Sequence, residues 1–398
     1  MIGRNSSDHE FLITLNIQTS INERVRLMQI VVRTEGLREA LAKFLTVVDR
    51  KNSRPILTCT LITVKDSFIE CVATDLEVSA KIIVNANVKE TGQFCVNTKN
   101  IFDILRELPD GEVTLEMGHN ETSLKIRYKE IFYSLLVYKT DDFPHLGFEN
   151  QFNKFSLKGY QLQEMINRTN HAISNDETRL YLNGIYFQEI DSKLRAVATD
   201  GHRLALIETP LEGHQIETLI NGIIIPRKGV TELKKISEAY SDHQLQISVD
   251  ESFMFVSAEN KYFLSIRLIA REYPKYQAVI PNKTSFKLIT DRDAFMVAVK
   301  RISLMSNEKS HGVKIKIGER EMTITAQRES SGEGTEKIPV DYDGKSMEIG
   351  FNARYLIDAL SALDGGEVSL ELNNELSPVI IKSQQLPHYL GIIMPLKL

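Results

Sequence analysis

The chain has 398 residues, of which 48 are Lys or Arg and 53 are Asp or Glu, so its formal net charge is −5. Apolar residues make up 42% and charged residues 25%, a balance that excludes long disordered, collagen-like and coiled-coil architectures. No stretch approaches the roughly 20 apolar residues of a membrane helix, and the three cysteines are too few for a disulfide framework. We therefore expect two or three domains in a reducing, cytoplasmic setting, with the cysteines in the core.

The first 27 residues read as an extension that precedes the first folded element. Their longest apolar run, Phe11–Ile13, is too short for the apolar part of a secretory signal. A strand-like run begins at Met28. We expect residues 1–27 to be either a disordered tail or an over-long start.

A pattern of apolar helix, turn and alternating strand recurs along the chain. Its clearest copies are Asn97–Met117 and Asn352–Leu372, and a weaker copy begins at Pro226, so the copies are 129 and 126 residues apart. A second, helix-opening segment recurs in the same register, at residues 37–45, 162–170 and 292–300. Three collinear copies of about 125 residues indicate three tandem domains of one kind.

A third matching pair supports this register. Cys71–Val78 and Ala196–Arg203 share the run Val-Ala-Thr-Asp and lie 125 residues apart. From Met28 onward the three repeats fill 371 residues, about 124 each. We therefore expect an N-terminal extension followed by three domains, over residues 28–150, 151–282 and 283–398.

Helical periodicity occurs twice in each repeat, and the segments between the helices are strand-like. The helix windows are 37–51, 98–108, 161–174, 226–239, 291–304 and 352–362. Strands such as Ser123–Tyr128 and Met322–Ala326 alternate with period two, so one face is buried and the other is wet. The expected class is α+β, with antiparallel sheet and two helices on its apolar face in every domain.

The charge is distributed unevenly between the helices and the rest of the chain. The six helix windows carry a combined formal charge of +5, which leaves −10 for the remainder. Basic helices on an acidic body suggest one surface that meets a polyanion, although ordinary solvated helix faces give the same pattern. No zinc-finger spacing or Arg-rich tract occurs, so sequence-specific DNA readout is not indicated.

Motifs that would signal an enzyme are missing, apart from one short cluster. The sequence contains no phosphate-binding G-x-x-x-x-G-K-[ST] loop, no H-E-x-x-H and no G-x-S-x-G. In Thr199–Arg203, Asp200 and His202 lie two residues apart, so they could bind a divalent metal or pair as acid and base. The nine histidines are otherwise scattered, and a structural turn with a specialised surface is the favoured interpretation.

Seven short segments, in order along the chain, carry a family resemblance. They are Leu182–Gly184, Ala198–Leu204, Ile225–Gly229, Tyr273–Tyr276, Ser306–Lys309, Gly350–Asn352 and Met394–Leu398. Together they resemble the bacterial DNA polymerase III beta subunit family, the sliding clamps, from Met28 to the end of the chain. The resemblance implies a DNA clamp fold of three tandem similar domains that closes as a ring in a head-to-tail homodimer.

The resemblance also implies a function without catalysis. Clamps of this family encircle duplex DNA without sequence preference and act as processivity factors in DNA replication, with helices lining the hole. The expected partners are a second copy of the chain, double-stranded DNA, the replicative DNA polymerase, the clamp loader, and other polymerases and repair proteins that carry a short linear motif. No cofactor, metal or membrane is implied.

The resemblance carries over a peptide-binding groove between the second and third domains, position by position. Its deep apolar subsite matches Leu182, Thr199, Gly201, His202, Arg203, Leu204, Pro274 and Val279. Its shallow part matches Arg179, Tyr181, Asn352, Tyr355, Leu376, Pro378, Ile392, Met394 and Pro395. Apolar anchors and a flexible Met suit a surface that takes many partners, although Leu182, Leu204 and Val279 taken alone would read as plain core.

DNA and dimer contacts are implied in the same way. The DNA-binding positions are Arg50, Lys51, Arg54, Lys99, Tyr181, Arg227 and Lys228. Leu304 and Met305 match an apolar dimer contact on the third domain. The acidic residues that could face Arg127 and Lys129 in the first domain of a second copy are Glu329, Glu333 and Glu336.

Three departures from the family pattern bear on these sites. Leu180 stands where many clamps have an aromatic residue that could stack on DNA. Asp176 and Glu177 place negative charge in a loop expected to be neutral or basic. Pro378 replaces a small polar residue at the groove edge, which would alter peptide preference.

Two other functions stay open at the level of sequence. A metal-dependent hydrolase would use Asp200 and His202. A monomeric interaction scaffold would keep the fold without closing a ring.

Overall fold

The structure is a computed structural model, and it describes residues 27–49, 53–118, 122–150, 153–211, 216–328 and 330–397. Its contacts divide the chain into two compact units. Unit 1 runs to Phe148 and includes Asn260–Phe263, and unit 2 holds Glu149–Glu259 and the chain from Leu264 onward. The second and third repeats therefore share one unit, and the domain boundaries at 150 and 282 stay predictions.

In the described part of unit 1, eight antiparallel strands form a sheet whose last strand pairs with its first. The strand order is β1-β6-β7-β8-β5-β2-β3-β4, and β4 pairs again with β1. The strands are β1 (Leu27–Arg33), β2 (Cys59–Val64), β3 (Phe68–Thr74), β4 (Val78–Glu90), β5 (Gly92–Asn97), β6 (Glu112–Gly118), β7 (Ser123–Tyr128) and β8 (Ile131–Tyr138).

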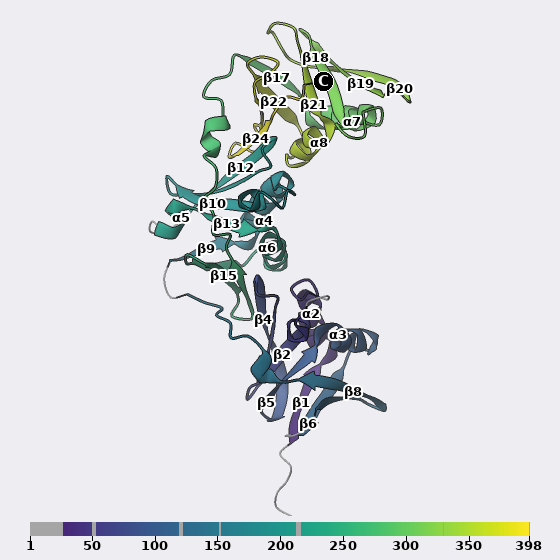
Figure 1. The fold of residues 1–398 in the computed structure, drawn as a ribbon, viewed down its shortest axis with the longest axis vertical. Helices are drawn as coiled ribbons and strands as arrows, with labels where there is room; N and C mark the ends of the chain where they lie inside the picture. Colours follow the sequence, from purple (N-terminus) through teal and green to yellow (C-terminus); the bar gives the residue numbers. More distant parts are fainter. Residues whose placement is uncertain are drawn as a thin grey trace, which may run out of the picture. The chain divides into compact units, whose positions relative to one another are not determined.

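Two helices, α2 (Thr34–Phe44) and α3 (Thr98–Glu107), pack against each other in unit 1 (Figure 1). Asn97 starts α3 because its side chain accepts a hydrogen bond from the Asn100 N–H, which would otherwise lack a partner. The apolar residues of both helices recur every three or four positions and are buried: Leu37, Leu41 and Phe44 on α2, Ile101 and Leu105 on α3. Short 3₁₀ turns lie at Pro55–Thr58 and Thr140–Asp142.

The described residues of the second and third repeats form three groups of hydrogen-bonded strands. Their orders are β16-β15-β14-β9, β13-β10-β11-β12-β24-β23-β22-β17 and β20-β19-β18-β21. The strands of the second repeat are β9 (Lys154–Lys158), β10 (Gly184–Ile190), β11 (Lys193–Thr199), β12 (Arg203–Pro210), β13 (Ile223–Pro226), β14 (Gln244–Val249), β15 (Phe253–Ala258) and β16 (Tyr262–Arg267). Those of the third are β17 (Phe286–Asp291), β18 (Gly312–Ile317), β19 (Glu321–Arg328), β20 (Gly332–Pro339), β21 (Met347–Asn352), β22 (Glu367–Leu372), β23 (Val379–Ser383) and β24 (Tyr389–Ile393).

One eight-stranded sheet crosses from the second repeat into the third. Strands β12 and β24 pair antiparallel from Arg203 opposite Ile393 to Ile207 opposite Tyr389. The chain between the repeats passes through a 3₁₀ turn at Tyr276–Val279. The two repeats of unit 2 are thus joined by backbone hydrogen bonds as well as by a connecting segment.

Each repeat of unit 2 also has a packed helix pair. The pairs are α4 (Gly159–Thr169) with α6 (Arg227–Ala239), and α7 (Arg292–Ser303) with α8 (Ala353–Ser361); a short helix α5 spans Glu217–Asn221. Asp291 and Asn352 cap α7 and α8 through their side-chain oxygens. The three repeats predicted from the sequence are confirmed, since each shows eight strands and two packed helices among its described residues.

Several details differ from the sequence predictions. The first helix ends at Phe44 rather than at residue 51, and the third ends at Thr169 and continues as a 3₁₀ turn, Asn170–Ala172. Leu27, placed in the extension, already pairs with Gly118 in β1; residues 1–26 lie outside the described part. The expected core position of the cysteines is confirmed, because all three are buried free thiols.

Burial raises the pKa of the Cys59 thiol to about 11 and the pKa values of Cys71 and Cys95 to about 12. These groups therefore stay protonated at neutral pH and have little reactivity. No helix in the described ranges is long and apolar enough to cross a membrane.

Candidate functional site

The turn between β11 and β12 is fixed by its own side chains. The Thr199 hydroxyl accepts from the Gly201 N–H at 3.1 Å and donates to the Arg203 carbonyl at 2.6 Å. One Asp200 oxygen accepts from the N–H groups of His202 at 2.9 Å and Arg203 at 3.0 Å. Gly201 has a φ of +90°, which a residue with a side chain rarely adopts. This turn leaves Gly201 and His202 exposed.

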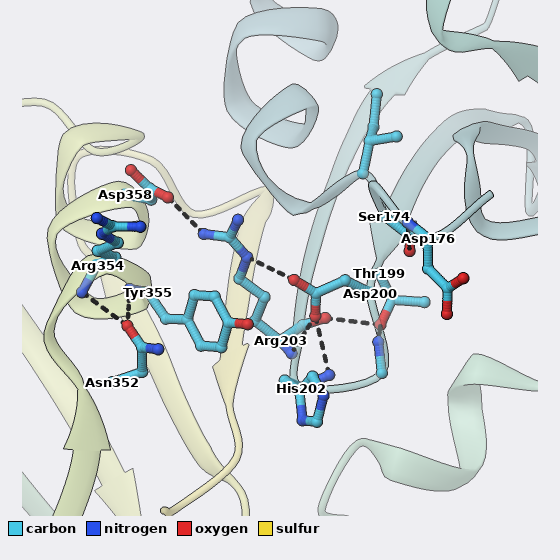
Figure 2. Close-up of polar contacts among 12 residues, drawn as sticks. Ser174, Asp176, Thr199, Asp200, His202, Arg203, Asn352, Arg354, Tyr355 and Asp358 are labelled. Atoms are coloured by element: carbon cyan, nitrogen blue, oxygen red, sulfur yellow. Dashed lines mark hydrogen bonds and ion pairs between the residues drawn. The ribbon is translucent and has the colours of Figure 1, made fainter. Parts of the chain in front are cut away.

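Arg203 connects that turn to helix α8 of the next repeat. Its Nε donates to the second Asp200 oxygen at 3.0 Å, and its Nη1 donates to Asp358 on α8 at 2.6 Å. The guanidinium lies 4.4 Å from the centre of the Tyr355 ring, also on α8. Figure 2 shows Arg203 between the two carboxylates, with the Tyr355 ring alongside. The arginine side chain is only 12% exposed, so these interactions are weakly screened by solvent.

The first turn of α8 supplies the opposite side of the site. The Asn352 side-chain oxygen accepts from the N–H groups of Arg354 and Tyr355, at 2.9 and 3.4 Å. Its amide nitrogen donates to the Ser310 carbonyl at 3.1 Å. The His202 and Tyr355 rings are 6.3 Å apart and 19° from parallel. Burial, aided by the Asp200 charge, raises the pKa of the Tyr355 phenol, so it stays neutral and can only donate or accept hydrogen bonds.

A loop before β10 borders the same turn. Arg179 pairs with Asp176 at 2.8 Å, and a Cβ atom placed on Gly201 would lie 3.1 Å from Arg179 Nη1. Hydrogen bonds from Thr178 and then Arg179 lower the pKa of Asp176. The acidic departure noted in the sequence is therefore neutralised within the loop by Arg179, whereas Glu177 is exposed. The Ser174 N–H donates to the Leu182 carbonyl and closes the loop.

Apolar residues below the turn form a core cluster. Leu182, Leu204 and Ile392 are 4%, 3% and 2% exposed, and they share the cluster with Tyr186 and Tyr273, whose rings stack at 4.6 Å. This part of the predicted deep subsite is closed by the chain's own side chains.

Two other apolar residues of the predicted groove are more exposed. Val279 on the connecting 3₁₀ turn is 45% exposed, and Met394 after β24 is 36% exposed. The Met394 N–H donates to the His202 carbonyl at 2.9 Å, which holds the C-terminal segment beside the turn.

The predicted groove residues are not equally well connected. Contacts join Arg179, Thr199, Gly201, His202, Arg203, Asn352, Tyr355 and Met394, and Tyr181 packs on the core cluster. Pro274 is exposed, and Pro378 and Pro395 are half-buried. Leu376 is 78% exposed in a turn held by Asn374, and its place in a groove stays a prediction.

The predicted DNA-binding residues lie in separate elements. In unit 1, Lys99 is exposed in the first turn of α3 and pairs with Asp103, and Arg54 is exposed before the 3₁₀ turn. In unit 2, Arg227 and Lys228 begin α6, and Arg227 donates to the carbonyls of Ile173 and Ser174 at 3.2 and 2.8 Å. Arg50 and Lys51 lie outside the described residues.

The predicted dimer residues include one exposed apolar side chain. Leu304 is 77% exposed at the end of α7, and Met305 beside it is half-buried. Glu336 pairs with Arg301 of its own chain, with 2.9 Å between Oε2 and Nε, whereas Glu333 is exposed. In unit 1 the Arg127 guanidinium lies 5.5 Å from the Phe132 ring and the Lys129 amine 5.5 Å from the Tyr128 ring. Glu329 lies outside the described residues.

Sequence reasoning missed Asp358, although a signal was present. Asp103 and Asp358 occupy the same position after the capping residues Asn97 and Asn352 in the first and third repeats. Asp103 pairs with Lys99 on its own helix, whereas Asp358 pairs with Arg203 of another repeat. The repeat marks the position, but only the fold reveals the partner.

The geometry does not favour a metal site at Asp200 and His202. Both Asp200 oxygens already accept hydrogen bonds within the turn or from Arg203. Across the described ranges, no three His, Cys, Asp or Glu side chains gather as metal ligands would. The Thr199–Arg203 cluster is a structural turn that presents a surface.

Comparison with known proteins places the whole fold in one family. Models of the N-terminal, central and C-terminal domains of the DNA polymerase III beta subunit match residues 28–147, 156–275 and 277–397. A beta sliding clamp of Caulobacter vibrioides is 33% identical over 377 residues, 93% of this chain and 100% of that protein. One from Rickettsia bellii is 31% identical, with the same shares covered.

Solved structures agree. A Caulobacter crescentus beta sliding clamp with bound PEG has a TM-score of 0.88 and 32% identity, covering 94% of this chain and 100% of that one. A Bartonella birtlesii sliding clamp bound to griselimycin has the same TM-score, identity and coverage. Members of this family are processivity factors of DNA replication and not enzymes. The chain belongs to the DNA polymerase III beta subunit family, the beta sliding clamps.

Proposed function

We propose that the chain closes with a second copy into a ring around duplex DNA and tethers the replicative polymerase, the clamp loader and other proteins through a peptide groove. Each copy contributes three domains, 28–150, 151–282 and 283–398. Membership of the beta sliding clamp family supports the proposal. A ring retains DNA by topology, so its phosphate contacts can be weak and independent of sequence, which permits sliding.

In this proposal the helices carry the DNA-facing charge. Lys99 on α3 and Arg227 and Lys228 on α6 lie in first turns, where the helix N–H groups also favour an anion. The pairing of Lys99 with Asp103 weakens its attraction for a phosphate. Such modest contacts suit a protein that must hold DNA without stopping on it.

The dimer contact would join the third domain of one copy to the first domain of another. Strand β20 is the end strand of its sheet and packs against α7, and Leu304 at the end of α7 is largely exposed. On the first domain, strand β8 exposes Phe132 and Leu136, 51% and 76% respectively. An unpaired sheet edge with apolar neighbours favours association with a second strand. Arg127, Lys129 and Glu333 would then supply polar contacts around it.

The peptide groove rests on one observation above all. Arg203 fastens the Thr199–Arg203 turn to α8, and the backbone of Met394, a partly exposed apolar residue, is hydrogen-bonded to the same turn. Interfaces of this kind bind through a few apolar anchors held by a rigid surround, and a flexible Met can adapt to several partners.

Fluorescence anisotropy with a labelled peptide of the Gln-Leu-x-Leu-Phe type tests the groove directly. We expect saturable binding to the full chain and loss of binding when Met394–Leu398 is deleted. Because the deletion also removes the Met394 and Leu396 backbone hydrogen bonds, Met394→Glu serves as a second variant that leaves the backbone intact. Unchanged binding by both variants in folded protein would contradict the groove.

A monomeric interaction scaffold is the remaining alternative, and solution mass separates it from the ring. Light scattering at micromolar concentration should give the mass of two chains, and Leu304→Glu should reduce it to one. A single-chain mass for the unsubstituted protein would favour the scaffold. We further propose a cytoplasmic location, which the three free cysteines support.

A further inference from the structure

The C-terminal end of α8 is capped by two arginines. The last carbonyls of a helix have no partner within it and must be satisfied from elsewhere. Arg292, at the start of α7, donates from Nε to the Leu360 carbonyl at 2.8 Å and from Nη2 to the Leu363 carbonyl at 2.6 Å. Arg168 donates from Nη1 to the Ala362 carbonyl at 2.7 Å.

Arg168 comes from the second repeat, on the last turn of α4, whereas α8 belongs to the third. Besides Ala362, its Nη2 reaches both oxygens of Asp364 at 2.9 Å, and Glu164 lies 3.5 Å away. The Arg168 side chain is only 16% exposed. A guanidinium in this position matches both the carboxylate and the negative end of the helix dipole, which makes the link stronger than an exposed ion pair.

Helix α8 is thus held to the second repeat at two places. Arg203 binds Asp358 in the body of the helix, and Arg168 binds its end. The first turn of the same helix carries Asn352 and Tyr355, which form one side of the proposed groove. We propose that Arg168 is a positioning residue that sets α8, and with it this side of the groove, against the Thr199–Arg203 turn. The inference rests on the proposed peptide-binding function.

The first repeat offers a matched control. There Arg38 on α2 caps α3, with its Nη1 3.4 Å from the carbonyls of Leu105 and Leu108 and its Nη2 2.6 Å from Asp110. Lys43, at the position of Arg168 in the repeat, pairs with Glu39 on its own helix. In the first repeat, the arginine that caps α3 thus comes from the same repeat. It uses the same kinds of contact as Arg168, to backbone carbonyls and to an Asp, but it does not join two repeats.

The test compares Arg168→Ala with Arg38→Ala in the full-length chain. Hydrogen exchange of the α8 and α3 amides reports each cap separately, and anisotropy with the Gln-Leu-x-Leu-Phe peptide reports the groove. We expect Arg168→Ala to speed α8 exchange about tenfold and to weaken peptide binding five- to tenfold. Arg38→Ala should speed α3 exchange and leave peptide affinity within twofold. Arg168→Lys keeps the charge attraction to Asp364 but not the paired guanidinium hydrogen bonds. It should therefore bind the peptide more tightly than Arg168→Ala and less tightly than the unsubstituted chain.

Each failure points to a different step. Unchanged α8 exchange in Arg168→Ala, or faster exchange with unchanged peptide affinity, would overturn the positioning role. Equal weakening by Arg38→Ala would overturn it too, because the effect would then be general destabilisation. If Arg168→Ala does not fold, Asp364→Asn with Asp110→Asn repeats the comparison on the carboxylate side. Failure of the unsubstituted chain to bind the peptide would overturn the proposed function, and this inference with it.

Discussion

The first and second repeats contain the same turn, and the two copies differ in what they hold. In the first, the Thr74 hydroxyl accepts from the Leu76 N–H and donates to the Val78 carbonyl, and one Asp75 oxygen accepts from the Glu77 and Val78 N–H groups. In the second, Thr199 and Asp200 make the same four bonds to the residues two, three and four positions after the threonine.

Three positions differ, Leu76 against Gly201, Glu77 against His202 and Val78 against Arg203, and the first and last of them distinguish the roles of the two turns. At the left-handed position the first repeat has Leu76, with a φ of +77°, and the second has Gly201. At the last position the first repeat has Val78, fully buried in its core, and the second has Arg203, which reaches another repeat. The Thr-Asp pair thus holds the backbone of the turn, and the last residue, Val78 or Arg203, decides whether the turn packs into the core or contacts another repeat.

Replacing Arg203 by Val, the residue of the first repeat, should have the largest effect on this comparison. The turn would keep its backbone bonds, but Asp358 and the nearly buried Asp200 would lose their shared partner. We expect the free energy of unfolding to fall by about 3 kcal/mol in urea titrations. Peptide binding should also be lost. A decrease of less than about 1 kcal/mol in the free energy of unfolding would mean that the contacts of Arg203 with Asp200 and Asp358 do not stabilise the fold.

The second repeat has a histidine, His171, where the first repeat has Thr46. We expect this histidine to make the stability of the fold depend on pH. Burial, and then the Arg203 charge, lowers the pKa of His171 from 6.5 to about 4. Between these values the unfolded chain binds a proton at this ring and the folded chain does not, so stability is full above pH 6.5 and falls as the pH drops towards 4. The loss is about 3 kcal/mol or less.

The variant His171→Gln isolates that contribution. Urea unfolding at pH 7 and pH 4.5 should show a smaller difference in stability for His171→Gln than for the unsubstituted chain. Carboxylates with lowered pKa values, such as Asp176, contribute to both proteins alike. An identical pH dependence in the two proteins would show that the pKa of His171 is the same in the folded and the unfolded chain.

Substituting the two residues at the left-handed position, Gly201 and Leu76, should produce smaller effects on stability. Gly201→Ala places a Cβ at positive φ and 3.1 Å from Arg179 Nη1, so we expect a loss of about 1 kcal/mol. Leu76→Gly relieves backbone strain but makes the unfolded chain more flexible, so its stability should change by less than about 1 kcal/mol. Thermal unfolding checks both. A large loss of stability in Leu76→Gly would mean that packing of the leucine side chain stabilises the fold.

The smallest effect is expected at Tyr389 on β24. Its hydroxyl is buried and has no hydrogen-bond partner among the described residues, and burial raises its pKa. Removing an unsatisfied polar group costs little, so Tyr389→Phe should change stability by less than about 0.5 kcal/mol or raise it. A clear loss of stability on denaturant titration would reveal a water or side chain that satisfies the hydroxyl.

Much of the fold could be predicted because it depends on local pattern. The repeat register, the helix pairs and the capping positions Asn97 and Asn352 are all visible in the sequence, since periodicity and capping act over a few residues. The end of the first helix at Phe44 was missed because the apolar pattern continues into the following turn, where Val47 and Val48 are also buried.

The residues of the site could be predicted mainly through the family resemblance. The contacts that hold them in place could not be predicted. Nothing in the sequence says that Arg168 and Arg203 cross to α8, because both partners lie more than 150 residues away. Nor could periodicity tell that Leu204 is closed within the core while Val279 is exposed. Such facts depend on which repeats pack together, and single-sequence patterns carry no record of that.

The pairing of β12 with β24 has a thermodynamic consequence. Because one sheet runs through the second and third repeats, neither repeat can unfold without breaking backbone hydrogen bonds of the other. We expect calorimetry to resolve these two repeats as one cooperative transition, so that the melting units are fewer than the repeats. A chain of three sequence repeats would then show fewer than three unfolding transitions in its heat-capacity profile.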